Sequence, residues 1–486
     1  MPDISPPVRS RRSRPLDTVV ARALLLGTLA VMPVTRVVTA QSSVMQFVDS
    51  LKQSSVSRES ELDSLVALAL EVNSSVRAAL ARVDAARARV GPAGAWSDPM
   101  LMAGIQNLPL GKERQTLASG MTARSGPDPM TMRMAGVSQT IPYPGKVSLR
   151  LRAAEREVDA AQASIEIVRR RVVRDVKGAY YELAFLDQAL SIVNRTRDVL
   201  SSFVQVTESR YGVGTAVQQD VLKAHVEATR VAETAVTLTE QRRAVLARLN
   251  SLLERPTDTP VEQPSVPTSL ARAAVPASAA EIRFTSTALG ARAGDSPLPP
   301  LAELQGTAAQ ENPEVREQDA MIGAQTARLE LARKDYLPDF DISLQYGRRG
   351  GGLPDMVTAL VSVPIPVFKG RKQDRGVAES SAQLAALEAE RRRKVNEIRA
   401  EVARLVSEIE RSRTQLALYV KALLPQARAS LASATASYQV GKVEFLTVLD
   451  DQATVFNYET EYFRALSDFA NDMAELERIV GKEIVR

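Results

Sequence analysis

Two matching stretches of the sequence each open a helical pattern of about 60 residues. The first runs Gln139-Thr-Ile-Pro-Tyr-Pro-Gly-Lys146, and its helical pattern lasts to about Tyr211. The second runs Val363-Pro-Ile-Pro-Val-Phe-Lys-Gly-Arg371, and its pattern lasts to about Tyr438. Each stretch combines a strand end with a proline-stiffened turn. A helix of about 60 residues is on the order of 90 Å long, about three times the hydrocarbon thickness of a bilayer. The sequence therefore predicts a long tube or rod.

The rest of the chain repeats around these two stretches. Tyr211 and Tyr438 are 227 residues apart, and so are Gly214 and Gly441. Each repeat contains a helix, at 61–90 or 301–335, then a strand pair, a long helix, a glycine turn and a return helix. Pro425 is expected to bend the long helix of the second repeat. We expect the first repeat at 41–255, a second repeat at 301–486, and between them a Pro-, Ala- and Ser-rich linker at 256–300.

Residues 1–40 have the pattern of a cleaved export signal. Four arginines within the first 14 residues precede a mostly apolar run, and Val38-Thr-Ala40 fits a small-residue cleavage site. This segment carries six Arg against two Asp, so removing its net +4 from the formal +5 leaves about +1 for the mature chain. That balance gives no reason to expect nucleic acid as a partner.

Four segments have strand character: 100–107, 131–141, 339–347 and 355–363. The third alternates, with Phe340, Ile342 and Leu344 on one face and Asp341 and Ser343 on the other. Four strands cannot close a barrel, and an open edge cannot face lipid. Three copies would supply twelve strands. The predicted fold is therefore mainly α with a transmembrane β-barrel: long helical hairpins form a helical barrel, and each chain gives four strands to a trimeric twelve-stranded barrel.

The ordered motifs resemble those of the TolC family of outer-membrane efflux proteins, in the branch that serves resistance-nodulation-division pumps for heavy metals or drugs. The resemblance covers nearly everything after about residue 60, and its motifs are Asn73-x-x-Val76, Asn312-Pro-x-Val315, Ser138-Gln-x-Ile-Pro-x-Pro-Gly-Lys146, Tyr-x-Val-Gly at both glycine turns, and Leu423-Leu-Pro-Gln-Ala427. The family implies a homotrimer in the outer membrane that extends into the periplasm. It also implies docking to a periplasmic adaptor and an inner-membrane pump, with passive conduction of metal ions, drugs or other small toxic compounds.

The resemblance also implies roles for particular residues. Adaptor docking is expected at the two tips, which comprise Tyr211, Gly212, Gly214, Tyr438 and Gly441. Asp450 and Asp451, and Asp220 after the first tip, are the candidates for acidic rings that narrow the pore, and Thr447 stands where another acid is often found. The alternative for these residues is a solvated acidic turn of a helix. Arg210 could latch the closed state by pairing with such an acid. The helix–strand corners are Pro142, Pro144, Gly145, Pro364, Pro366 and Gly370.

The composition argues against enzymatic chemistry. The chain has no cysteine and only one histidine, His225, so we expect no catalytic, cofactor-binding or metal site. Half of the twelve methionines fall within 100–134, where a copper role is conceivable but lipid contact or packing is the simpler explanation. The alternatives to an efflux duct are a type I secretion duct and, from another class, a periplasmic coiled-coil adaptor.

Overall fold

The computed structural model describes residues 61–108, 115–116, 122–123, 131–275, 298–349 and 353–484. The predicted export signal lies outside these residues. The first repeat contains the helix Glu61–Val72 and the elements α2 Ser74–Gly94, β1 Met100–Gln106, β4 Met132–Ile141, α3 Lys146–Gly212 and α4 Gln218–Leu252. The second contains α6 Leu301–Glu311, α7 Pro313–Lys334, β5 Phe340–Arg349, β6 Met356–Ser362, α8 Gln373–Leu418, the π-helix η1 Tyr419–Leu423, α9 Leu424–Gln439 and α10 Phe445–Val480.

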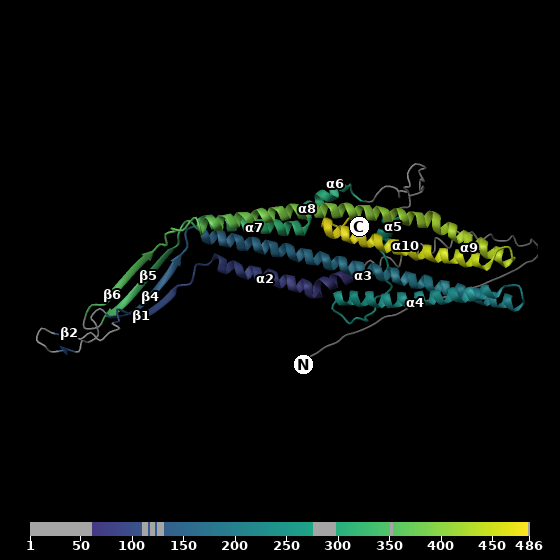
Figure 1. The fold of residues 1–486 in the computed structure, drawn as a ribbon, viewed down its shortest axis with the longest axis horizontal. Helices are drawn as coiled ribbons and strands as arrows, with labels where there is room; N and C mark the ends of the chain where they lie inside the picture. The colour runs from purple at the N-terminus through teal and green to yellow at the C-terminus, as the bar shows by residue number, and fades with distance from the viewer. Residues whose placement is uncertain are drawn as a thin grey trace, which may run out of the picture. The chain divides into compact units, whose positions relative to one another are not determined.

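The four long strands form one antiparallel sheet in the order β1-β4-β5-β6. Strands β4 and β5 join the two repeats, with Ile141 opposite Phe340 and Met132 opposite Arg349. Strands β1 and β6 are the edges of the sheet, and in Figure 1 the sheet continues from the ends of α2, α3, α7 and α8. Two further short strands, β2 Gln115–Thr116 and β3 Thr122–Ala123, follow β1 and precede β4 in the chain, and they pair with each other.

The shorter helices pack along the two long helices, α3 and α8. Helix α3 contacts α2, α4, α7 and α10, and α8 contacts α7 and α10. Figure 1 shows α2 and α4 following one another along α3, and α7 and α10 following one another along α8. The main core lies where these helices meet, and its fully buried side chains include Tyr180, Leu183, Val402, Ile409 and Phe469. Apolar residues at alternating steps of three and four form one apolar face on each long helix. Packing of this face stabilises the helix, while its other faces are polar and exposed.

The asparagines of the two Asn-x-x-Val motifs interrupt helices that the sequence led us to expect as continuous. We expected one helix at 61–90 and another at 301–335, but the chain breaks at Asn73 and at Asn312. Each asparagine accepts a hydrogen bond as an N-cap, Asn73 from the Ser75 N–H and Asn312 from the Glu314 N–H. Each also donates its side-chain amide to the end of another helix, at the Leu252 and Ile479 carbonyls, both at 2.9 Å. These residues therefore join α4 to α2 and α10 to α7.

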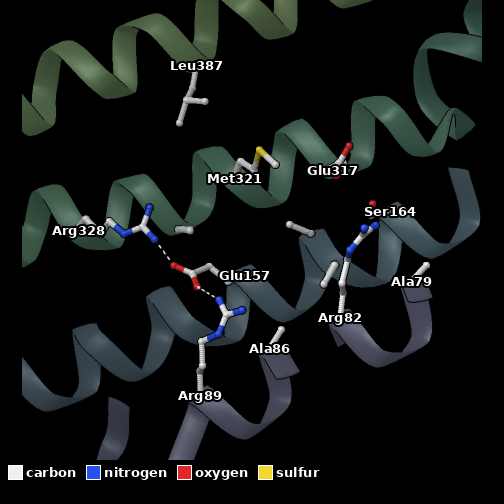
Figure 2. A pocket seen from close by; sticks show the side chains of 13 residues that line it. Ala79, Arg82, Ala86, Arg89, Glu157, Ser164, Glu317, Met321, Arg328 and Leu387 are labelled. Carbon is white, nitrogen blue, oxygen red and sulfur yellow. Dashed lines mark hydrogen bonds and ion pairs between the residues drawn. The ribbon is translucent and has the colours of Figure 1, made fainter. Parts of the chain in front are cut away.

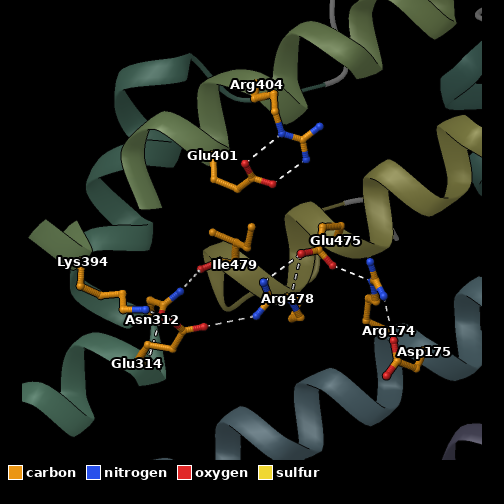
Figure 3. Close-up of polar contacts among 10 residues, drawn as sticks. All are labelled: Arg174, Asp175, Asn312, Glu314, Lys394, Glu401, Arg404, Glu475, Arg478 and Ile479. Atoms are coloured by element: carbon orange, nitrogen blue, oxygen red, sulfur yellow. Dashed lines mark hydrogen bonds and ion pairs between the residues drawn. The ribbon is translucent and has the colours of Figure 1, made fainter. Parts of the chain in front are cut away.

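A network of ion pairs surrounds the second of these joints (Figure 3). Glu314 of α7 contacts Lys394 of α8 at 3.0 Å and Arg478 of α10 at 3.4 Å. Arg478 also contacts Glu475, which in turn contacts Arg174 of α3 at 2.7 Å. Four helices are therefore linked at one level of the bundle.

Two other expectations need adjustment. Pro425 was expected to bend its helix, and the backbone changes to the π-helix η1 directly before it. A π turn absorbs a missing hydrogen bond without ending the helix. The predicted irregular linker contains a short helix, α5 Thr268–Ala274, whose Leu270 and Ala274 are buried, and residues 276–297 lie outside the described part.

Within the described residues no single helix has the length and apolarity of a membrane span, although the bent pair Glu61–Val72 and Ser74–Gly94, meeting at 44°, passes that test jointly.

Candidate functional site: tips, acidic residues and corners

The tips are closed by backbone turns and one arginine. Gly214 and Gly441 adopt φ of 75° and 72°, a left-handed conformation that ends a helix at low cost in glycine. Arg210 donates hydrogen bonds to the Tyr438 carbonyl at 3.1 Å and the Gln439 carbonyl at 2.9 Å. Its guanidinium also lies 4.5 Å from the centre of the Tyr438 ring. Arg210 therefore ties the end of α3 to the end of α9.

These contacts differ from the latch expected from the sequence, in which Arg210 pairs with an acid. Arg210 donates instead to carbonyl oxygens at the C-terminus of α9, where the helix dipole favours a cation. A role in opening the channel stays a prediction. Behind the tip, Phe445 is buried against Phe203 and Tyr438, with ring centres 5.9 and 5.4 Å away.

Replacing Arg210 with lysine should loosen the tip. Lysine keeps the charge but loses the planar fork that reaches two carbonyls, so local opening should become about 1–2 kcal/mol easier. We expect amide exchange in the last turn of α9 to accelerate about tenfold, measured by hydrogen–deuterium exchange. Arg230→Lys, which affects an exposed pair with Glu227, is the control. Unchanged exchange at the tip would show that the two carbonyl contacts contribute nothing.

The three candidate pore acids lie on two helices. Asp450 is exposed on α10, Asp451 accepts a 3.0 Å hydrogen bond from Ser430, and Asp220 lies in the first turn of α4. Among the described residues, no group of three or more His, Cys, Asp or Glu side chains could hold a metal ion. One chain alone does not assemble these carboxylates into a site, so a pore ring made from several copies stays a prediction.

The first helix–strand corner holds a buried lysine. Pro142, Pro144 and Gly145, the last with φ of 89°, connect β4 to Lys146 at the start of α3. The Lys146 side chain is only 5% exposed, and its Nζ lies 2.9 Å from Asp339 and 3.4 Å from Asp335. Burial alone would raise the pKa of Asp339, but the Tyr143 N–H and Lys146 outweigh it and lower that pKa. The sequence showed Lys146 as the last residue of the corner motif but not its burial between two acids, although a cation at a helix N-terminus signals a need for an acidic partner.

The second helix–strand corner exposes apolar side chains, whereas the first corner buries Lys146. Pro364, Pro366 and Gly370 connect β6 to α8, and between them Ile365 and Phe368 are 80% and 75% exposed. This stretch and Lys146 line one cavity of about 600 Å³. A strongly exposed apolar stretch of this kind marks a contact surface.

A second cavity, of about 480 Å³, lies between α2, α3, α7 and α8 (Figure 2). Glu157 of α3 is held by Arg328 of α7 and, at 3.9 Å, by Arg89 of α2. Burial raises the pKa of Glu317, which also lines this cavity. Much of the remaining lining is alanine, including Ala79, Ala86, Ala160, Ala161 and Ala324, so small side chains allow these helices to approach closely. The arrangement is that of close helix packing around one carboxylate paired with two arginines.

A third cavity, of about 470 Å³, contains an acidic side chain that the sequence did not single out. Burial, followed by the charges of Glu408 and Asp468, raises the pKa of Asp472 to about 6, against the lowering effect of Arg411 and Arg404. Other charged groups line the same cavity: Arg174, Asp175, Glu182, Arg248 and Glu475. The acidic and basic side chains around this cavity come from different helices. No local sequence pattern therefore predicts that Asp472 is surrounded in this way.

Asp472→Asn should stabilise the protein at neutral pH. A carboxyl whose folded pKa exceeds its unfolded value gives most stability when protonated, and that stability is lost as pH rises through about 6. After allowing for solvent screening, we expect a gain of about 1–2 kcal/mol at pH 8 that shrinks as pH falls from 6 to 4. Thermal unfolding across pH measures it. Asp175→Asn, which breaks a 2.8 Å pair with Arg174, should destabilise instead. A pH-independent effect of Asp472→Asn would contradict the raised pKa.

The fold places the chain in a class of duplicated helical-hairpin proteins whose sheet has two open edges. The chain belongs to the outer membrane efflux protein family, whose model matches residues 65–254 and 304–482. It is 23% identical over 342 residues to the cobalt-zinc-cadmium resistance protein CzcC of Cupriavidus metallidurans, covering 70% of this chain and 74% of that protein. It is also 23% identical over 422 residues to the pyoverdine export outer membrane protein OpmQ of Pseudomonas putida, covering 83% and 82%.

Solved structures agree on the fold. The outer membrane protein VceC of Vibrio cholerae superimposes with a TM-score of 0.69 at 19% identity, covering 87% of this chain and 97% of that one. CusC superimposes with a TM-score of 0.67 at 16% identity, covering 87% and 92%. These findings confirm the predicted family and the mainly helical fold with a four-stranded sheet. The family is one of outer-membrane channels, which favours a duct over a periplasmic adaptor.

Proposed function

We propose that the protein is the outer-membrane exit duct of a tripartite efflux system. Three copies close a twelve-stranded barrel and a helical barrel, which conduct cargo passively from a periplasmic adaptor and an inner-membrane pump. The energy for transport comes from those partners, so the duct itself needs only a path and a gate.

The observation that carries this proposal is the pair of open edges, β1 and β6, on a sheet with an exposed apolar face. Leu101, Ile105, Leu344, Val357 and Val361 are 57% or more exposed and belong to that face. Unpaired backbone groups at such edges cannot remain in lipid, whereas pairing β6 of one copy with β1 of the next satisfies them. An antiparallel pairing is available because β1 and β6 run in opposite directions.

The tips support docking to an adaptor. Val213, Val217 and Val440 are 73%, 61% and 68% exposed around the glycine turns, so an apolar surface is available beside Tyr211, Gly212 and Tyr438. We propose metal ions or small toxic compounds as cargo, in keeping with a relative named for cobalt-zinc-cadmium resistance, with Asp450, Asp451 and Asp220 as the selectivity residues. The pump selects the cargo, so the duct alone does not distinguish an efflux system from a secretion system. The alternative is therefore a type I secretion duct.

Cysteine cross-linking tests the barrel directly, because the chain contains no cysteine of its own. Ala359→Cys on β6 is combined in turn with Leu101→Cys, Ala103→Cys and Ile105→Cys on β1, all on the apolar face. We expect one combination to give covalent trimers on oxidation in outer-membrane fractions, and Ala359→Cys alone to give none above dimer. A monomer in every combination, together with a monomeric mass in detergent, would overturn the proposal.

A further inference from the structure

All five methionines of the four long strands lie on the same face of the sheet. Directly opposed residues share a face. The register places Met100 opposite Ser138, Met102 opposite Gly136, and Gly104 opposite Met134. On the other side of Met134 the row continues through Gly347 to Met356, and Met132 lies opposite Gln106 and Arg349.

This face is the polar one. Its other members include Ser138, Ser343, Gln345 and Thr358, whereas the opposite face carries the exposed apolar side chains described above. Methionines that served as lipid contacts would be expected among those apolar side chains. In the closed barrel of the proposed function, on which this inference rests, the methionine face lines the channel. Lipid contact therefore does not explain them, contrary to one expectation from the sequence.

Three of these methionines surround Gly347. Met134 and Met356 are its register partners on β4 and β6, about 10 Å apart at the usual strand spacing. The Met132 sulfur lies over the glycine, 2.8 Å from the position that a Cβ would occupy there. Any side chain at 347 would therefore displace a sulfur, and glycine at this point of a strand permits the close approach.

One charge opposes a cation at this position. The Arg349 guanidinium contacts the Met356 sulfur, so a positive charge already lies beside that thioether. A cation bound nearby must displace the arginine. This competition weakens binding, as a conducting pathway requires if the ion is to leave.

We propose that the Met132, Met134 and Met356 thioethers form a weak binding site for soft monovalent cations, Cu(I) or Ag(I), at the outer part of the channel. Thioether sulfur selects such ions over hard or borderline divalent cations. Met102 and Met100 continue the line of sulfurs towards the helical end of the sheet, at about 7 Å per two residues. Binding forms only sulfur–metal coordination bonds, with no change of oxidation state.

The test uses the full mature trimer in detergent with silver nitrate in chloride-free buffer. Equilibrium dialysis measures the affinity, and X-ray absorption at the silver edge reports the ligand type. The triple variant Met132→Leu, Met134→Leu, Met356→Leu keeps volume and apolarity, and Met321→Leu with Met473→Leu on α7 and α10 is the matched control. Met121 and Met130 are retained in every variant, so any binding there is a constant background.

We expect sulfur-ligated silver in the wild type, at least tenfold weaker binding in the triple variant, and wild-type binding in the control. Arg349→Gln should tighten silver binding several-fold, and zinc should not compete. Equal silver binding by the triple variant, or none by the wild-type trimer, would overturn the site while leaving the duct intact. Retention of a bulky apolar dye, with no silver bound, would assign the methionine face to organic cargo and would also overturn the proposed cation site. Failure to form a trimer would overturn the proposed function and this inference together.

Discussion

Replacing the buried Lys146 with methionine should lower the free energy of unfolding by about 3 kcal/mol, more than the removal of an exposed charge would. The variant keeps the length and apolarity of the stem but deletes the cation between Asp335 and Asp339. Two carboxylates would then face each other beside an apolar corner with no counter-charge. The start of α3 would also lose its tie to the second repeat, because Asp339 binds both Lys146 and the Tyr143 N–H.

The sign of the pH dependence provides a specific check on this account. Because the folded pKa of Asp339 is depressed, its stabilising effect is present above the unfolded pKa and is lost as pH falls through the folded value. The deficit of Lys146→Met should therefore shrink in acid, where the carboxylates become protonated. Adding Asp339→Asn should recover part of the loss at pH 7, since the amide oxygen can still accept from Tyr143.

Thermal unfolding monitored by circular dichroism measures these effects, with Lys442→Met, an exposed lysine at the tip, as the control. If Lys146→Met and Lys442→Met cost the same, or if the deficit of Lys146→Met were constant from pH 4 to pH 8, the buried ion pair would not be what secures the corner.

The repeated pattern predicted most of the fold because it depends on local features that a sequence displays. Glycines at Gly214 and Gly441 end helices through their own backbone freedom, and strand alternation near Phe340 follows from a period of two. The four strands and both long helices therefore appear within a few residues of their predicted limits. The break within each shorter helix was missed because helical periodicity continues on both sides of Asn73 and Asn312.

The site was less predictable because its contacts join residues far apart in the chain. Arg210 was a candidate latch or an ordinary surface arginine, and within one chain it meets the Tyr438 and Gln439 carbonyls, 228 and 229 residues away. The methionines near residue 100 were visible as a cluster. Only the strand register shows that Met356, from the second repeat, shares their face. Period two separates the two faces of a strand but does not say which strand lies beside it.

Asn312→Leu should cost about 2–4 kcal/mol, because one side chain serves two buried backbone groups. Its Oδ1 accepts from the Glu314 N–H at 2.8 Å, and its Nδ2 donates to the Ile479 carbonyl at 2.9 Å. Leucine satisfies neither, and Asn312 is only 2% exposed, so water cannot replace both bonds. The loss should appear as a lower unfolding temperature together with faster amide exchange at the end of α10.

Asn312→Asp separates the two roles of this side chain. Aspartate still caps α7 but cannot donate, and it places a negative charge beside the C-terminal carbonyl of α10, so we expect about 1–2 kcal/mol of destabilisation with rapid exchange confined to α10. Asn73→Leu should cost less than Asn312→Leu, because Glu254 also accepts from the Ser74 N–H at the first joint. Gln305→Leu, which removes an exposed amide that donates to the Arg399 carbonyl, is the control and should cost under about 1 kcal/mol. If Asn312→Asp were as stable as the wild type, capping alone would explain the asparagine, and the bond to Ile479 would not be what holds α10 in line with α7.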